Sequence, residues 1–236
     1  MHDDRVCKES CLKAVNSVGT NIKKTQMKYF GIGVKKTSTT TLGDYFEACG
    51  VKRFYGGNVA LTQQFLRGDL TALDEVVEKY DGFEDAPWFM AYEYLYQKHP
   101  NAKFILTVRS SPEKWLKSCF KHCENYGMQF PFKQVFGYQS PKGREKEYLN
   151  AYENHNKSVE EFFSDKQNQF LKICFEEVTA HDKIVKFLGR NPEEIKPIWS
   201  NSGARGRFDD SRLFKPRSIA VYYTRRLLAS LNLPVP

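Results

Sequence analysis

Residues Phe30-Gly-Ile-Gly-Val-Lys-Lys-Thr-Ser-Thr-Thr-Thr-Leu42 decide the fold of this chain. The apolar and glycine residues at their start predict a short buried strand over 29–34. A helix is predicted directly after the hydroxyl-rich turn, because apolar residues return there at helical spacing and Gly50 is a typical C-terminal stop. The apolar side of this helix consists of Leu42, Tyr45, Phe46 and Cys49.

The turn itself has the composition of an anion-binding loop. The first turn of a helix leaves backbone N–H groups unpaired, and the helix dipole makes that end positive. Lys36 adds a full positive charge. Hydroxyl donors for the oxygens of an anion come from Thr37, Ser38, Thr39, Thr40 and Thr41. A threonine-rich helix start beside two solvated lysines would have the same residues, so the loop alone leaves both interpretations open.

Length and charge narrow the class of protein. A chain of 236 residues can bury a full core, and we expect a single domain over 1–236. The net charge of +8 favours an anionic partner without naming it. The six cysteines are scattered and the start is unlike a signal peptide, so we expect reduced thiols and a soluble, cytoplasmic protein without a membrane span.

Strands and helices are predicted to alternate along the rest of the chain. Such alternation implies a three-layer α/β fold with a mostly parallel sheet and helices on both faces. Residues 1–26 are expected to be a polar lead-in, and 121–144 a long loop that acts as a lid. Further strands are expected at 51–55, 103–109 and 170–175, and helices at 61–80, from Asp85 to Pro100, after Ser111, over 148–162, 179–188 and 218–231.

The loop is not a Walker A motif, because Phe30 and Lys35 stand where that motif needs glycines. It resembles instead the phosphosulfate loop of the sulfotransferases, which wraps the 5′-phosphate of 3′-phosphoadenosine 5′-phosphosulfate (PAPS). The matching residues are Lys36-Thr37-Ser38-Thr39-Thr40. Ser38 departs from the family pattern, which usually has glycine at this position, so the turn must tolerate a Cβ.

A second segment, from Asn101 to Ser118, strengthens the resemblance. It consists of a predicted strand ending in Arg109, followed by a proline-started helix. In the sulfotransferases the corresponding Arg and Ser hold the 3′-phosphate of the nucleotide, which implies this role for Arg109 and Ser118. Ligands of open α/β sheets bind at the carboxyl ends of the strands, so Arg109 and the loop should face the same site. Arg205 and Gly206 are a weaker match to the family's further contact with this phosphate.

The resemblance implies transfer of a sulfuryl group from PAPS to a hydroxyl, or less often an amine, of a small molecule or glycan, with release of 3′,5′-ADP. Lys36 would neutralise charge on the bridging phosphate oxygen. The resemblance implies that Asp85 of the Asp85-Ala-Pro87 element is the base, although it could equally be a helix N-cap. His155 is the alternative base or a core histidine. No metal is implied.

Three other functions remain open on the sequence. A kinase-like nucleotide or small-molecule enzyme would share the site but needs a Walker A pattern and a metal-binding carboxylate. A nucleic-acid-binding protein would present exposed aromatics on a cationic face, whereas the aromatics here follow buried periodic stripes, so we expect no nucleic-acid partner. A catalytically silent relative would only bind the nucleotide, and Ser38 keeps this alternative open.

Overall fold

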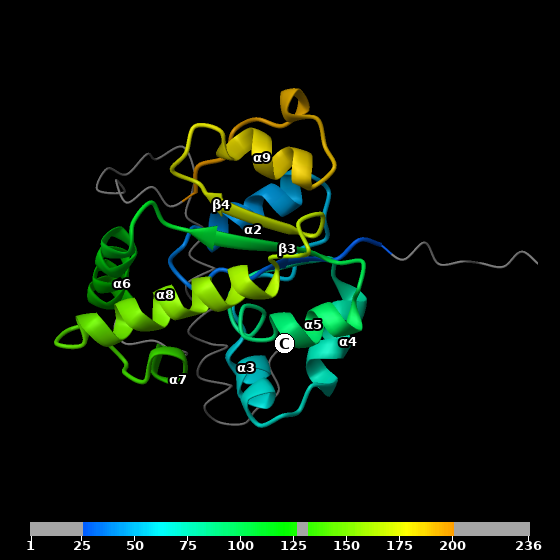
Figure 1. Cartoon of the computed structure of the whole chain (residues 1–236). Helices are drawn as coiled ribbons and strands as arrows, with labels where there is room; N and C mark the ends of the chain where they lie inside the picture. Colours follow the sequence, from blue (N-terminus) through cyan, green and yellow to red (C-terminus); the bar gives the residue numbers. More distant parts are fainter. Residues whose placement is uncertain (1–25, 127–131, 201–236) are drawn as a thin grey trace, which may run out of the picture.

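The computed structural model describes residues 26–126 and 132–200. In this part of the chain four parallel strands form one sheet in the order β2-β1-β3-β4 (Figure 1). The strands are β1 Tyr29–Gly31, β2 Gly82–Phe83, β3 Lys103–Val108 and β4 Phe170–Cys174. The helices are α2 Thr39–Ala48, α3 Val59–Leu66, α4 Thr71–Lys79, α5 Tyr92–Lys98, α6 Pro112–Tyr126, α7 Phe132–Phe136, α8 Glu145–Phe162 and α9 Ala180–Phe187, with a 3₁₀ turn η1 at Pro192–Glu194.

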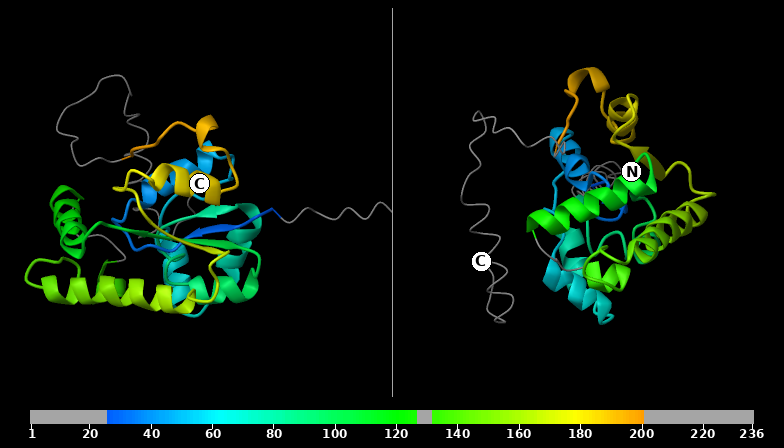
Figure 2. Two further views of the ribbon diagram at one scale, coloured as in Figure 1. Left: turned by 45° about the horizontal axis from the view of Figure 1, so that its top comes forward. Right: turned by 90° about the vertical axis from the view of Figure 1, so that its left-hand side faces the viewer.

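Helices cover both faces of the sheet, as Figures 1 and 2 show. Alternate residues of the strands point to opposite faces, so that Phe30 and Phe104 enter one apolar core and Tyr29 and Ile105 the other. The larger core is closed by α3, α4, α5, α6 and α8, and the smaller one by α2 and α9. The predicted three-layer α/β fold with a parallel sheet is therefore confirmed.

Four predicted elements differ from the structure. The helix expected over 61–80 is two helices, α3 and α4, separated at Gly68 with a φ of +81°. The strand expected at 51–55 is reduced to a single bridge between Arg53 and Gly82, and the edge strand is instead the two-residue β2. This segment lies beside β2, but too few of its backbone groups pair to make a strand.

The other two differences concern predicted functional regions. The helix expected from Asp85 begins only at Tyr92, with Ala91 at its N-cap, so the N-cap interpretation of Asp85 is wrong. The expected loop at 121–144 is also wrong in part, because 121–126 continue α6 and 132–136 form α7. The predicted lead-in over 1–26 lies outside the described residues except for Gln26, and the predicted helix over 218–231 lies entirely outside them.

No helix in the described ranges has both the length and the apolar character needed to cross a membrane.

Candidate functional site

The loop between β1 and α2 has a strained backbone at two positions. Lys36 and Ser38 have positive φ angles of 77° and 72°, a left-handed conformation that costs a non-glycine residue roughly 1–2 kcal/mol. Ser38 is the N-cap residue of α2, but its side chain makes no capping hydrogen bond. The chain thus keeps the backbone shape of a glycine turn and adds a hydroxyl, while the first N–H groups of α2 stay available for an anion.

The base of this loop is locked to strand β3 by buried hydroxyls. Thr37 is fully buried, and its hydroxyl donates to the carbonyl of Val34 at 2.6 Å and pairs with the Thr107 hydroxyl at 2.6 Å. Gly33 lies so close to β3 that a Cβ there would come within 2.1 Å of Thr107 Oγ1 and 2.4 Å of its carbonyl oxygen. Thr37 therefore holds the loop's shape, and its buried hydroxyl is engaged by Val34 and Thr107.

Arg109 lies directly after β3 and contacts the loop from the neighbouring strand. Its Nη1 donates to Ser38 Oγ at 3.2 Å, and its backbone N–H donates to the Tyr152 hydroxyl at 3.1 Å. Its Nε is 2.8 Å from Glu176 Oε1; this is an ion pair, since the N–H is not aligned with that oxygen as in a hydrogen bond. The side chain of Arg109 keeps 27% of its surface exposed, so the guanidinium remains accessible.

Two lysines of the loop interact electrostatically with each other and with Asp85. Burial lowers the pKa of Lys36, and the charge of Lys35 lowers it further. Burial also lowers the pKa of Lys35, while the negative charge of Asp85 acts to raise it. The backbone at Lys35 is held by Trp115, whose Nε1–H donates to the Lys35 carbonyl at 3.0 Å. Two cations are thus concentrated where the positive end of α2 begins.

Asp85 follows β2 at the same edge of the sheet. Its φ is +68°, a left-handed backbone for an L residue. Its Oδ1 is buried and has no hydrogen-bond partner among the described residues. Asp85 also acts on Lys36, whose pKa it raises against the stronger effect of burial. An acceptor oxygen that has no donor in the described part of the chain and interacts electrostatically with two cations is suited to take a proton from a bound molecule.

His155 lies on α8, under the start of the loop. Its Nε2 is 2.8 Å from the carbonyl oxygen of Ile32, and because a carbonyl only accepts, Nε2 carries the proton. Burial lowers the pKa of His155, although the Ile32 contact acts in the opposite direction. Phe89 and Tyr92 pack against the ring edge-on. The histidine therefore supports the loop from below.

The remaining predicted residues lie at different places. Thr39, Thr40 and Thr41 form the first turn of α2, where Thr40 is exposed and the Thr41 hydroxyl donates to the Ser200 carbonyl at 3.2 Å. Ser118 lies half-buried on α6. Arg205 and Gly206 lie outside the described residues.

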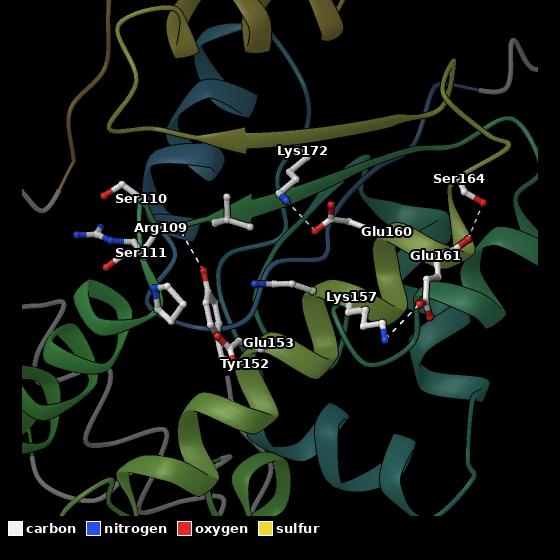
Figure 3. Close-up of a pocket in the computed structure, with 13 residues that line it drawn as sticks. Arg109, Ser110, Ser111, Tyr152, Glu153, Lys157, Glu160, Glu161, Ser164 and Lys172 are labelled. Atoms are coloured by element: carbon white, nitrogen blue, oxygen red, sulfur yellow. Dashed lines mark hydrogen bonds and ion pairs between the residues drawn. The ribbon is translucent and has the colours of Figure 1, made fainter.

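A groove of about 530 Å³ runs from Arg109 along α8. Figure 3 shows Tyr152, Glu153 and Lys157 on its α8 side and Lys172 on the β4 side, with the guanidinium of Arg109 directed away from the Lys172–Glu160 pair. The groove carries charges of both signs. Within the described ranges, no three His, Cys, Asp or Glu side chains are grouped so that they could hold a metal ion.

Sequence reasoning missed three contributors to the site: Gly33, Thr107 and Glu176. Two of them carry a recognisable signal. Thr107 is the one hydroxyl residue between Phe104 and Val108 in an otherwise apolar strand. Glu176 is the first acidic residue after β4, and the carboxyl ends of parallel strands meet at one edge.

Part of this chain is similar to known proteins. Residues 28–138 match the family described as sulfotransferase domain. The protein named Ava biosynthesis cluster protein M, from Aspergillus versicolor, is 29% identical over 108 residues, which cover 39% of this chain and 41% of that protein. The chain thus spans about two fifths of the length of the curated relative it matches. The resemblance seen in the sequence is confirmed, because residues 28–138 match the sulfotransferase domain family.

Proposed function

We propose that this protein binds PAPS and transfers its sulfuryl group to a hydroxyl or amine of a small-molecule or glycan acceptor, releasing 3′,5′-ADP. The observation that carries the proposal is the contact between Arg109 and Ser38 at 3.2 Å. It joins an anion-binding loop after β1 to a partly exposed guanidinium after β3, the adjacent parallel strand. Two separate cationic positions at one edge of the sheet suit a ligand with two phosphate groups.

In this proposal the loop holds the 5′-phosphosulfate end. The first N–H groups of α2 and the hydroxyl of Thr40 bind phosphate oxygens. Lys36 lies against the bridging oxygen, where negative charge grows as the S–O bond breaks. A cation fixed at that point stabilises the transition state more than the bound substrate, and this difference accelerates transfer. Arg109 and Ser118 bind the 3′-phosphate, together with Arg205 and Gly206.

Asp85 is the base that we propose for the acceptor. This role is supported by Oδ1, which has no hydrogen-bond partner among the described residues, and by the positive charges of Lys35 and Lys36, which interact with Asp85. His155 is the weaker candidate, because its Nε2–H is already committed to the carbonyl of Ile32. The acceptor proton would pass to Asp85 as the acceptor oxygen or nitrogen bonds to sulfur.

We also propose that the chain forms one domain in a reducing, cytoplasmic setting. Both apolar cores lie against the same sheet, which supports a single folding unit. The free thiols of Cys49, Cys119, Cys123 and Cys174 support a reducing compartment.

Calorimetry on the full chain tests which nucleotide the protein binds. We expect 3′,5′-ADP to bind more tightly than 5′-AMP or ATP with Mg²⁺. Arg109→Gln should weaken the binding of 3′,5′-ADP about 10- to 100-fold, because losing a hydrogen bond to a charged group costs about 1.5–3 kcal/mol. Arg144→Gln is the matched control, because it removes an arginine at the start of α8 that is paired with Glu147. It should leave the affinity for 3′,5′-ADP unchanged. Equal binding of ATP and 3′,5′-ADP would reject the proposal in favour of a kinase-like enzyme.

Transfer of radiolabelled sulfate from PAPS tests the reaction. The acceptor panel contains phenols, alkyl alcohols, amines and glycans, and labelled product from at least one class is expected. Tight binding of 3′,5′-ADP without transfer to any class would identify a silent nucleotide-binding relative instead.

A further inference from the structure

Glu176 is an acidic side chain in the middle of a cationic site. It follows β4 by two residues and reaches across the sheet edge to the end of β3. One carboxylate oxygen is 2.8 Å from Arg109 Nε. The other accepts the hydroxyl of Ser110 and lies 3.2 Å from Lys114 Nζ, which also donates to the Ser110 hydroxyl at 2.7 Å. Three residues from the end of β3 and the start of α6 thus converge on a single carboxylate.

We propose that Glu176 is a positioning residue that orients the Arg109 guanidinium toward the 3′-phosphate of the nucleotide. The inference rests on the proposed function, because it assigns Arg109 that ligand. A free arginine side chain samples many rotamers, and fixing it before the ligand arrives reduces the entropy lost on binding. Glu176 holds the Nε edge while Ser38 meets Nη1, so the guanidinium plane is fixed from two sides.

A carboxylate near a phosphate site has an opposite effect, namely repulsion. Burial alone would raise the pKa of Glu176, but the Ser110 hydrogen bond and the charges of Lys114 and Arg109 lower it, so the group is ionised at neutral pH. Its charge is matched by these two cations at short range, and its side chain is 27% exposed, so solvent screens its repulsion of a bound anion. The orienting effect should therefore exceed the repulsion, and the sign of the measured change decides between them.

The experiment measures, on the full chain, the affinity for 3′,5′-ADP divided by that for 5′-AMP, which lacks the 3′-phosphate. Glu176→Gln should lower this ratio about threefold, in the range of a partly exposed ion pair. The neighbouring Glu177→Gln is the matched control, since it removes an equal charge but only a pair with Lys183 at 2.9 Å. It should leave the ratio unchanged. In an Arg109→Gln background, Glu176→Gln should not lower the ratio further, because the guanidinium that Glu176 orients is gone.

Each outcome has a distinct meaning. A ratio that rises or stays constant in Glu176→Gln, while the wild-type protein prefers 3′,5′-ADP, overturns the positioning role and leaves the proposed function standing. An equal fall in Glu177→Gln, or a fall that persists without Arg109, also overturns it, because the effect is then general. A wild-type protein that binds neither nucleotide overturns the proposed function and this inference together.

Discussion

Replacement of Thr37 by valine should loosen the loop and destabilise the protein. Valine matches threonine in shape but removes both hydrogen bonds of the buried hydroxyl, to Val34 and to Thr107, each 2.6 Å long. Each net hydrogen bond is worth about 1 kcal/mol, and the groups left unpaired in the interior add to the loss. We expect the free energy of unfolding to fall by about 2–3 kcal/mol. The melting temperature should drop by roughly 5–10 °C for a chain of this size.

Urea denaturation measures this change, and two further variants make it specific. Thr62→Val is the matched control, because Thr62 is about as buried, but among the described residues its hydroxyl bonds only the carbonyl of Asn58, the N-cap residue of its own helix. It should cost less than about 1 kcal/mol. The double replacement of Thr37 and Thr107 by valine should cost less than the two single costs added together, since no unpaired hydroxyl remains. A Thr37→Val protein as stable as the Thr62→Val protein would refute the reasoning.

Three further predictions concern the same site. His155→Gln can still donate to the Ile32 carbonyl, so nucleotide affinity should persist. Because burial lowers the pKa of His155 in the folded protein, the contribution of this group to wild-type stability is full above about pH 6.5 and is lost as the pH falls through the folded-state pKa. The variant should lack this part of the pH dependence when its free energy of unfolding is measured by urea titration at several pH values. Asp85→Asn should abolish sulfate transfer but retain 3′,5′-ADP binding by calorimetry, and a variant that still turns over would exclude Asp85 as the base. Gly33→Ala should reduce both the yield of folded protein and nucleotide binding, because the added Cβ would lie 2.4 Å from the Thr107 carbonyl oxygen. A variant with a normal circular dichroism spectrum and normal nucleotide affinity would contradict this prediction.

The sequence predicted the layers of the fold well because they depend on local patterns. The apolar run of β3 and the periodic stripe of α8 match the structure closely. Edge elements were predicted poorly. β2 has only two residues and owes its place to pairing with β1, which no local pattern encodes. The split between α3 and α4 depends on a single glycine, Gly68, inside a segment with good helical periodicity.

The site shows the same division between local and long-range information. The sequence predicted that the loop and Arg109 meet at one sheet edge, because parallel strands end together, and the Arg109–Ser38 contact agrees with that expectation. It could not predict that Thr37 would turn inward, since this depends on Thr107, seventy residues later in the chain. Nor could it find the ion pair between Arg109 and Glu176, which requires the order of the strands.

The two cross-links between the loop and β3 have a consequence for the kind of ligand that fits. Thr37 is joined to Thr107, and the next residue, Ser38, is joined to Arg109 two positions further along. The separation between the helix N-terminus and the guanidinium is therefore set by the protein frame before any molecule arrives. This fixed separation should select ligands by the distance between their two charged groups. An anion whose charged groups are too close together or too far apart would bind weakly, even if its total charge were high.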